Sequence, residues 1–348
     1  MVDISFIVPV YNLNREELKQ CIESVSCQST GNNEIIIVDD GSSNGIEGYC
    51  DELGKQNNIT VIHQKNQGLA VARNTGIEAA HGEWVVHVDG DDWVDQHLAE
   101  SLLEASKITK PDIFLWGFIL ATGKQRRELL LKEKKAFDRP YECLRESILC
   151  AILDADKSYC DLSINTSWAK AYRREFLILN GLAYEPQLRR AQDAAYNLRA
   201  FNRAKSVVYI DRALNFYRND NVSLSRGYNP RTLDFLSATA ISVKNFVISE
   251  GQSEKVKEAS NVFIQRLFRM INSQYFQHKD NKLPYKEKKK LFDNTINSEP
   301  FLSAFNSGLK RPALLDKIAD ILYQKKAFAL ILIYSNLLSY AHKLKSKL

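Results

Sequence analysis

The chain has 348 residues, of which 45% are hydrophobic, and a formal net charge of +5. This length suffices for one large domain plus a smaller appendage, and the absence of repeats and low-complexity tracts excludes a repeat protein. The six cysteines form no CxxC pair, which gives no indication of a zinc site, and the N-terminus lacks a secretory signal pattern. We therefore expect reduced thiols in a soluble, cytoplasmic protein.

The first ninety residues alternate between apolar runs and helical patterns. Helix 15–27 carries Leu18, Ile22 and Val25 on one face, and a second helix is expected at 68–80. Near-continuous apolar, β-branched runs, typical of strands buried on both faces of a parallel sheet, occupy residues 4–10, 34–40, 59–63 and the segment that ends at residue 89. This order predicts an open α/β domain with right-handed crossovers.

In such sheets ligands bind beyond the carboxyl ends of the strands. Tyr11, Asp40 and Asp89 all fall at these ends. We therefore expect one binding site that combines the three residues.

The most informative segment is residues 84–93, Trp-Val-Val-His-Val-Asp-Gly-Asp-Asp-Trp, because a hydrophobic strand leads directly into carboxylates. Asp89 and Asp91 alternate along the chain and can share a face, while Gly90 lets the backbone approach a ligand closely. Such hard oxygen ligands suit Mg²⁺ or Mn²⁺ held together with substrate phosphates. An ordinary acidic turn is the alternative, whereas the spacing excludes an EF-hand.

Four motifs in order resemble the nucleotide-binding half of family 2 glycosyltransferases, which have the GT-A fold. They are residues 7–12 (Ile-Val-Pro-Val-Tyr-Asn), 38–43 (Val-Asp-Asp-Gly-Ser-Ser), 66–76 (Asn-Gln-Gly-Leu-Ala-Val-Ala-Arg-Asn-Thr-Gly) and 89–92 (Asp-Gly-Asp-Asp). The similarity continues through 167–174, 190–193 and 216–218, so it covers about the first two thirds of the chain. It implies a mostly parallel, Rossmann-like sheet with flanking helices, followed by a helical C-terminal appendage.

The resemblance implies a donor site for a nucleotide-sugar. Asp40 would accept a hydrogen bond from the base of a uridine nucleotide, and Tyr11 would pack on its ring, with the backbone near Pro9 and Val10 closing the pocket. Asp89 would contact the ribose or the metal.

Asp91 would hold Mn²⁺ or Mg²⁺ against the donor diphosphate, neutralising charge that grows as the nucleotide leaves. Lys65 and Arg73 would add positive charge there. For Arg73, an ion pair with a sheet-end carboxylate such as Asp39 is an equally good interpretation.

Inverting transfer needs a carboxylate on the acceptor side to remove the hydroxyl proton. Asp193 matches the Asp of the family's Glu-Asp pair and begins an expected helix at 194–204, where backbone amides can orient it. Gln192 stands where the family has Glu; losing that charge should lower the pKa of Asp193 and affects how acceptors are held. A simple helix cap is the alternative role for Asp193. On the acceptor side, Trp168 either stacks on a sugar ring or is buried. The same two alternatives apply to Trp93 and Trp116.

The basic character belongs to the C-terminal region. Residues 251–348 hold 18 Lys or Arg against 8 Asp or Glu, a net charge of +10, and residues 1–250 carry −5. An apolar run at 327–340 is interrupted by Ser335 and Asn336 and is too short to span a bilayer, which needs about 20 apolar residues. Lysines flank it on both sides, at 325, 326, 343, 345 and 347. We expect an interfacial helix on an anionic membrane; packing on the protein's own core or on a partner subunit is the alternative.

The sequence thus predicts a GT-A domain at 1–225, with a nucleotide-sugar half at 1–110 and an acceptor half at 111–225, and a helical region at 226–348. The expected activity is inverting, metal-dependent transfer of a hexosyl or N-acetylhexosaminyl group from a UDP-sugar to a glycan on a polyprenyl diphosphate carrier, in bacterial capsule or exopolysaccharide synthesis. We expect a peripheral location at the inner face of the cell membrane and no nucleic-acid partner, and a homodimer is compatible with the sequence. The alternatives are a nucleotidyltransferase and a non-catalytic glycan-binding scaffold.

Overall fold

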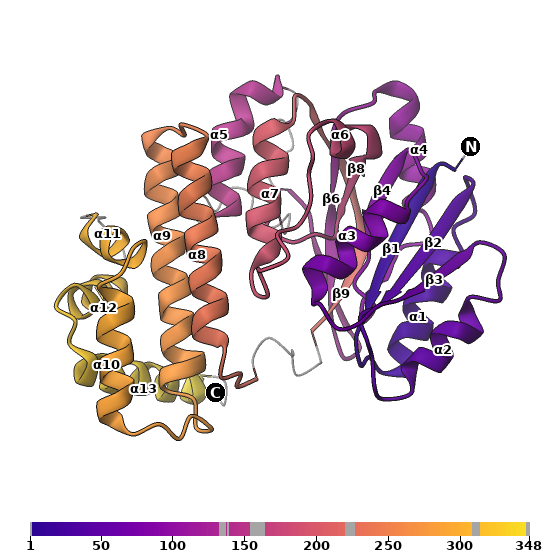
Figure 1. The fold of residues 1–348 in the computed structure, drawn as a ribbon. Helices are drawn as coiled ribbons and strands as arrows, with labels where there is room; N and C mark the ends of the chain where they lie inside the picture. The colour runs from indigo at the N-terminus through magenta and orange to yellow at the C-terminus, as the bar shows by residue number, and fades with distance from the viewer. Residues whose placement is uncertain are drawn as a thin grey trace. The chain divides into compact units, whose positions relative to one another are not determined.

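The computed structural model describes residues 2–131, 137, 139–153, 164–219, 227–307 and 314–345. The chain divides into two compact units, residues 1–222 and 223–348 (Figure 1). The described helices and strands of the first unit are β1 (Ile4–Val10), α1 (Arg15–Ser26), β2 (Asn33–Asp39), α2 (Ile46–Leu53), β3 (Ile59–His63), α3 (Leu69–Ala79), β4 (Trp84–His87), β5 (Trp93–Val94), α4 (Leu98–Ile108), β6 (Ile113–Thr122), β7 (Gln125–Leu129), α5 (Tyr141–Ile152), β8 (Lys170–Arg173), α6 (Arg174–Leu179), α7 (Gln192–Arg203) and β9 (Val207–Arg218).

The described strands of this unit form one mixed sheet in the order β3-β2-β1-β4-β8-β6-β9-β5, with β7 paired to β6. Strands β3, β2, β1 and β4 run parallel, as the apolar runs predicted. Strand β8 enters antiparallel between β4 and β6, and β9 returns parallel to β6. The parallel half therefore carries the predicted nucleotide motifs, while the mixed half begins directly beside the acidic strand β4.

Both faces of the parallel half are covered by helices (Figure 1). Phe6 and Val8 of β1 point into a hydrophobic cluster with apolar residues of α1, α2 and α4. Ile7 points to the other face, where α3 packs so closely that a Cβ on Gly76 would lie 2.3 Å from the Ile7 side chain. The glycine of the 66–76 motif is thus explained by helix-on-strand packing.

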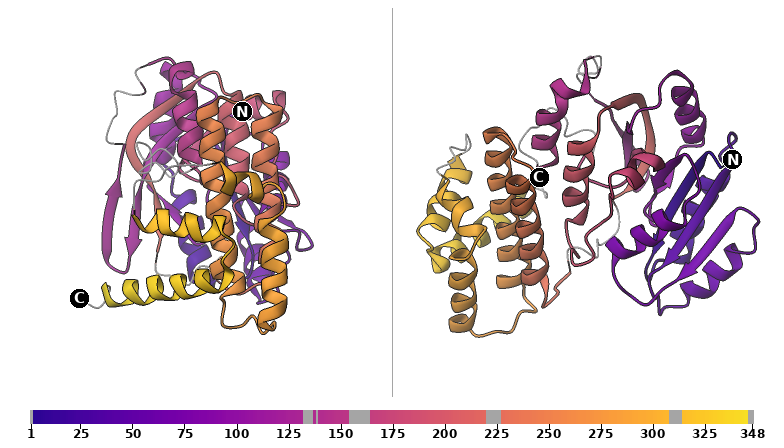
Figure 2. Two further views of the ribbon diagram at one scale, coloured as in Figure 1. Left: turned by 90° about the vertical axis from the view of Figure 1, so that its left-hand side faces the viewer. Right: turned by 45° about the horizontal axis from the view of Figure 1, so that its top comes forward.

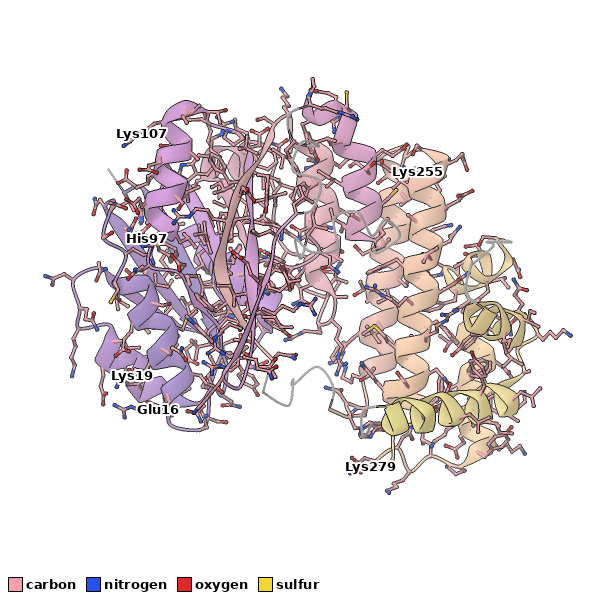
Figure 3. The ribbon with its side chains drawn as sticks, turned by 180° about the vertical axis from the view of Figure 1, so that it is seen from behind. Glu16, Lys19, His97, Lys107, Lys255 and Lys279 are labelled. Carbon is pink, nitrogen blue, oxygen red and sulfur yellow. The ribbon has the colours of Figure 1, made fainter. Side chains whose placement is uncertain are left out.

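Charged residues of α1 and α4 lie on the outer faces of these helices. Glu16 and Lys19 of α1 and Lys107 of α4 are exposed and labelled in Figure 3. On α1, the buried residues are Leu18, Cys21, Ile22 and Val25, which is the predicted apolar face. The five described cysteines are free thiols; Cys160 lies outside the described residues.

The second unit is helical in its described part, with α8 (Thr232–Ser249), α9 (Glu254–Ile271), the π-helical turn η4 (Asn272–Phe276), α10 (Tyr285–Ile296), α11 (Phe301–Asn306), α12 (Leu314–Gln324) and α13 (Phe328–Lys345). Helices α8 and α9 form an antiparallel pair, and α13 crosses them at one end of the unit (Figure 2). The ring of Phe268 on α9 lies 5.0–5.7 Å from those of Phe292, Phe301, Phe305 and Tyr323. This aromatic cluster joins α9 to α10, α11 and α12.

Helix α13 has two distinct apolar faces. Phe328 and Ile331 are only 2% and 1% exposed, and the Phe328 ring lies 4.8 Å from that of Phe292. Leu330, Ile333 and Leu337 are 55%, 57% and 64% exposed. In the described part of the chain, no helix combines the length and the apolar character that crossing a bilayer requires.

Candidate functional site

Strands β2, β1 and β4 are neighbours and parallel, so the residues that follow them lie along one edge of the sheet. Asp40 follows β2, Tyr11 follows β1 and Asp89 follows β4. The structure therefore brings together the three strand-end residues that the sequence predicted.

Asp40 is 3% exposed and is held by the loop before α3. Its Oδ1 accepts hydrogen bonds from Gln64 Nε2 at 2.7 Å and the Gln67 amide at 2.8 Å, and its Oδ2 accepts one from the Gly68 amide at 2.7 Å. Gly68 has φ +88°, a conformation that favours glycine. Asp40 thus orients the loop that leads into α3, and Oδ2 keeps one further acceptor position.

The sequence interpretation left open whether Arg73 pairs with Asp39. In the structure Asp39 accepts hydrogen bonds from His63 Nδ1 at 2.8 Å and the Ser42 amide at 3.0 Å. The hydrogen bond that His63 donates to Asp39 raises the pKa of His63. Arg73 pairs with other carboxylates.

The Arg73 side chain is fully buried and joins Asp89 to Asp193. Its Nη2 donates to Asp89 Oδ1 at 2.7 Å, and its Nη1 donates to Asp193 Oδ1 at 2.5 Å. The guanidinium also lies 5.5 Å from the centre of the Tyr184 ring. One side chain of α3 thus fixes both the first carboxylate of the acidic run and the predicted base, although these are 104 positions apart in the sequence.

Asp193 lies in the first turn of α7, where the sequence predicted a helix start, but it does not cap the helix. The N-cap position belongs to Ala191, which has φ +51° and provides no side-chain cap. The cap interpretation of Asp193 is therefore wrong, because its carboxylate turns to Arg73 instead. Burial raises the pKa of Asp193, and Arg73 opposes this rise. The effect of Gln192, in place of Glu, on the pKa of Asp193 stays a prediction.

The acidic run divides its three carboxylates between two environments. Asp92 is 3% exposed and accepts a hydrogen bond from the Arg218 amide at 2.7 Å. Arg218 Nε donates to the Asp91 carbonyl at 2.8 Å, which closes β9 over the turn. Burial, reinforced by the charge of Asp89, raises the pKa of Asp91 to about 6. Asp89 and Asp91 therefore remain available at the sheet edge, while Asp92 is structural.

Gly90 has a packing role that the sequence interpretation missed. A Cβ there would lie 2.5 Å from Leu13 Cδ1 and 3.2 Å from the Pro9 carbonyl oxygen. Gly90 therefore allows a close approach to the end of β1, and its contact with a nucleotide stays a prediction.

The other predicted nucleotide-binding residues differ in accessibility. Pro9 and Val10 are buried in β1, so only their backbone can line a pocket, while Tyr11 is 43% exposed and Lys65 is exposed.

The tryptophans near the acceptor half are mostly core residues. Trp168 is 6% exposed, and its ring stacks on Tyr217 at 5.4 Å. Trp116 is fully buried and donates to Asn215 Oδ1 at 2.7 Å. Gln192 is 7% exposed. These values correspond to the buried alternative for Trp168 and Trp116, since neither presents a free ring face to a sugar.

Sequence reasoning missed a buried polar cluster beneath Asp193. Lys170 is 0% exposed, donates to the carbonyls of Thr166 and Trp168, and has a pKa lowered to about 7 by burial. His87 is also 0% exposed, and neither ring nitrogen has a hydrogen-bond partner among the described residues. Two features of the sequence could have indicated this cluster: a lysine inside the apolar segment 168–172 and a histidine within the apolar strand β4.

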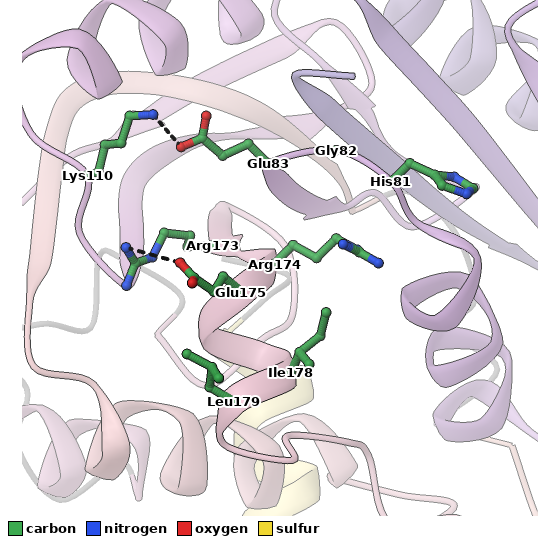
Figure 4. A pocket seen from close by; sticks show the side chains of 9 residues that line it. All are labelled: His81, Gly82, Glu83, Lys110, Arg173, Arg174, Glu175, Ile178 and Leu179. Atoms are coloured by element: carbon green, nitrogen blue, oxygen red, sulfur yellow. Dashed lines mark ion pairs between the residues drawn. The ribbon is translucent and has the colours of Figure 1, made fainter. Parts of the chain in front are cut away.

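A separate open pocket of about 570 Å³ lies at the opposite end of the strands from the predicted site. It is formed by residues just before β4 and at the end of β8 (Figure 4). Its lining includes the ion pair of Lys110 with Glu83, at 2.7 Å, and the exposed Ile178 and Leu179. It contains none of the predicted site residues.

The mixed sheet with helices on both faces and a helical C-terminal region is a GT-A-like fold. A crystal structure of S. aureus TarS residues 1–349 in complex with UDP-GlcNAc superposes with a TM-score of 0.68 and 17% identity, covering 98% of this chain and 92% of that one. A second crystal structure of TarS 1–349 gives a TM-score of 0.64. At this identity the likeness shows the fold alone.

The sequence comparisons define the family. The model of glycosyl transferase family 2 matches residues 5–179. The uncharacterized glycosyltransferase EpsJ of Bacillus subtilis is 32% identical over 267 residues, 76% of this chain and 75% of that protein. The putative glycosyltransferase EpsH of the same organism is 30% identical over 269 residues, 75% and 74% of the two chains. The chain belongs to glycosyl transferase family 2, as its motifs predicted.

Proposed function

We propose that this glycosyltransferase is inverting and metal-dependent, and that it transfers a hexosyl or N-acetylhexosaminyl group from a UDP-sugar to a lipid-linked glycan in bacterial surface polysaccharide synthesis. The observation that carries the proposal is the buried Arg73, which holds Asp89 of the donor edge and Asp193 of the acceptor half on one guanidinium. This arrangement keeps a metal-site carboxylate and a candidate base at a fixed separation.

A uridine donor is supported from two sides. Oδ2 of Asp40 keeps an acceptor position that suits the imide N–H of uracil, and Tyr11 is exposed beside it for contact with the ring. TarS, with the same fold, has been crystallised with UDP-GlcNAc and with UDP. We expect the backbone at Pro9 and Val10 and the charge of Lys65 to complete the nucleotide site.

The residues present fit a divalent cation. Asp91 has a raised pKa because it is buried beside the negative charge of Asp89, and a bound cation would relieve that repulsion. Within the described residues, no group of three or more His, Cys, Asp or Glu could hold a metal. Mg²⁺ and Mn²⁺ suit such a site, since they take one or two carboxylates and complete their shell with substrate phosphates. When bound, the cation would supply charge to stabilise the departing diphosphate.

Asp193 is proposed to remove the proton from the acceptor hydroxyl as the sugar carbon is attacked. Arg73 occupies Oδ1 of Asp193, so the remaining lone pairs of the carboxylate can face the acceptor. Burial raises the pKa of Asp193 and so strengthens it as a base, whereas Arg73 keeps it ionised. Gln192, at the start of α7, would contribute to acceptor binding without adding a second charge.

A lipid-linked acceptor is supported by the second unit. Leu330, Ile333 and Leu337 follow helical spacing and are exposed on α13, and the sequence around this helix is rich in lysine. An apolar stripe flanked by lysines suits the surface of an anionic leaflet. We therefore propose peripheral binding at the inner face of the cell membrane.

The experiment is UDP release from a panel of UDP-sugars, measured with Mg²⁺ or Mn²⁺ and again with EDTA. We expect metal-dependent release that Asp193→Asn slows by about 10²-fold or more, the scale of a lost general base. Nucleotide binding without turnover of any donor would favour a scaffold, and release of pyrophosphate from a nucleoside triphosphate would favour a nucleotidyltransferase.

A further inference from the structure

Asp193 receives a second hydrogen bond from the interior of the protein. The two residues involved, Ser167 and Tyr184, lie outside the motifs of the donor site. Ser167 is fully buried, and hydrogen bonding by its side chain lowers the pKa of Asp193 against the effect of burial. Ser167 Oγ also lies 2.6 Å from the hydroxyl oxygen of Tyr184. Because an ionised carboxylate only accepts, Ser167 donates its single proton to Asp193, and Tyr184 must donate to Ser167.

Tyr184 can fill this role because it stays protonated and fixed. Burial raises the pKa of the Tyr184 hydroxyl well above its ordinary value, so the group remains a donor throughout the working range. The Tyr184 amide donates to Asn74 Oδ1 at 2.7 Å, and Asn74 Nδ2 donates to the Tyr184 carbonyl at 2.8 Å. Asn74 immediately follows Arg73 on α3. Two consecutive residues of α3 therefore hold the two groups: Arg73 binds Asp193, and Asn74 binds the backbone of Tyr184.

The rings and the turn around this pair limit their movement. Tyr184 stacks flat on Tyr196 of α7, with centroids 3.9 Å apart and planes 4° apart. The carbonyl of Thr166, next to Ser167, accepts bonds from Lys170 Nζ at 2.8 Å and from Asn197 Nδ2 at 2.7 Å. Asn197 lies one helical turn after Asp193 on α7. The turn that carries Ser167 is thus tied to the helix that carries the base.

From these contacts we infer that Ser167 and Tyr184 are positioning residues, which set the orientation of the Asp193 carboxylate through the chain Tyr184 to Ser167 to Asp193. Arg73 holds Oδ1 from the donor side and Ser167 holds the carboxylate from the core side, so the group presents one defined edge to the acceptor hydroxyl. Both residues are buried, at 0% and 1% exposed. The inference rests on the proposed role of Asp193 as the base.

Ser167→Ala and Tyr184→Phe each remove one hydroxyl from this chain. A lost hydrogen bond to a charged group corresponds to a rate loss of about tenfold to 150-fold, so we expect kcat for UDP release from the best UDP-sugar of the panel to fall by about that factor in Ser167→Ala. We expect a fall of up to about tenfold in Tyr184→Phe. The Kd for UDP should stay within about twofold, and the double variant should lose little more than Ser167→Ala alone.

The matched control is Tyr196→Phe. Tyr196 is equally buried and is the stacking partner of Tyr184, but its hydroxyl has no hydrogen-bond partner among the described residues. Its removal should leave kcat unchanged. A crystal structure of Ser167→Ala should show the Asp193 carboxylate rotated from its wild-type orientation, which is a measurement independent of any donor.

The role of Asp193 as the base and the positioning role of Ser167 and Tyr184 can be refuted separately. If Asp193→Asn keeps its turnover, the proposed base is wrong. If Asp193→Asn is inactive but Ser167→Ala and Tyr184→Phe keep wild-type kcat, or if Asp193 does not move in the Ser167→Ala crystal structure, the positioning role is overturned while the base stands. Equal losses in Tyr184→Phe and Tyr196→Phe would also overturn it, because packing would then explain both.

Discussion

Replacing Arg73 by methionine should destabilise the first unit strongly and in a pH-dependent way. Arg73 is fully buried and neutralises Asp89 and Asp193, whose side chains are 27% and 24% exposed. Methionine fills a similar volume but leaves two carboxylates uncompensated. Removing one partner of a buried ion pair costs about 3–5 kcal/mol, so we expect a loss of that size in the free energy of unfolding at pH 8.

The pH dependence follows from Asp193. Arg73 lowers the pKa of Asp193 against the effect of burial, so its removal raises that pKa further above the unfolded value. Such a carboxylate is costly only while ionised, and the cost disappears as pH falls through the folded pKa towards the unfolded one. The destabilisation by Arg73→Met should therefore be smaller at pH 5 than at pH 8.

Tryptophan fluorescence during urea unfolding measures this directly, because all four tryptophans, at 84, 93, 116 and 168, belong to the first unit. The matched control is Arg15→Met. Arg15 pairs with Glu52 at 2.8 Å, but both side chains are more than half exposed, so its loss should cost about 0–1 kcal/mol at either pH. An Arg73→Met loss that equals the control, or one that grows on acidification, would refute the reasoning.

Three further results are expected. Asp91→Asn should abolish transfer mainly by weakening metal-diphosphate binding, as should EDTA with the wild type; because the pKa of Asp91 is about 6, wild-type affinity for Mn²⁺ and UDP, measured by calorimetry, should fall as pH drops below that value. Asp193→Asn should leave nucleotide-metal affinity within a few-fold while kcat falls by about 10² or more; equal losses in both would move Asp193 to the donor site. Replacing Leu330, Ile333 and Leu337 by serine should reduce sedimentation with anionic liposomes and leave the melting temperature nearly unchanged.

The control for the α13 variant is Ile241→Ser with Ile248→Ser, two exposed residues of α8. This double variant should bind liposomes as the wild type does; equal losses in both variants would argue against α13 as the membrane contact. Substitution is a cleaner test than deleting α13, because Phe328 and Ile331 are buried and their removal would open the aromatic cluster.

The parallel half of the sheet was predictable because its strands are continuous apolar runs. The predicted strand at 59–63 coincides with β3, and the helix at 15–27 differs from α1 by one residue. The mixed half gave weaker signals. Strand β5 has only two residues, and β7 reads Gln-Arg-Arg-Glu-Leu and is almost entirely exposed, so neither carries a buried apolar pattern.

The candidate site was predictable by residue type but not by pairing. Motifs identified Arg73, Asp89 and Asp193, yet nothing local indicates that one guanidinium serves both carboxylates, because the second partner is 120 positions away. The inward turn of Asp92 depends on Arg218 of β9, which is 126 positions away. Such pairings follow from how the strands assemble, and they require the three-dimensional structure.

The bond between Arg218 and Asp92 has a consequence for how the protein matures on the ribosome. Strands β1 to β4 can pair once about ninety residues have emerged, and the parallel half can begin to form then. The acidic turn must wait, because the amide that satisfies the buried Asp92 carboxylate belongs to the last strand of the unit. The hydrogen bond that satisfies the buried Asp92 carboxylate can therefore form only after β9, the last strand of the unit, has been synthesised.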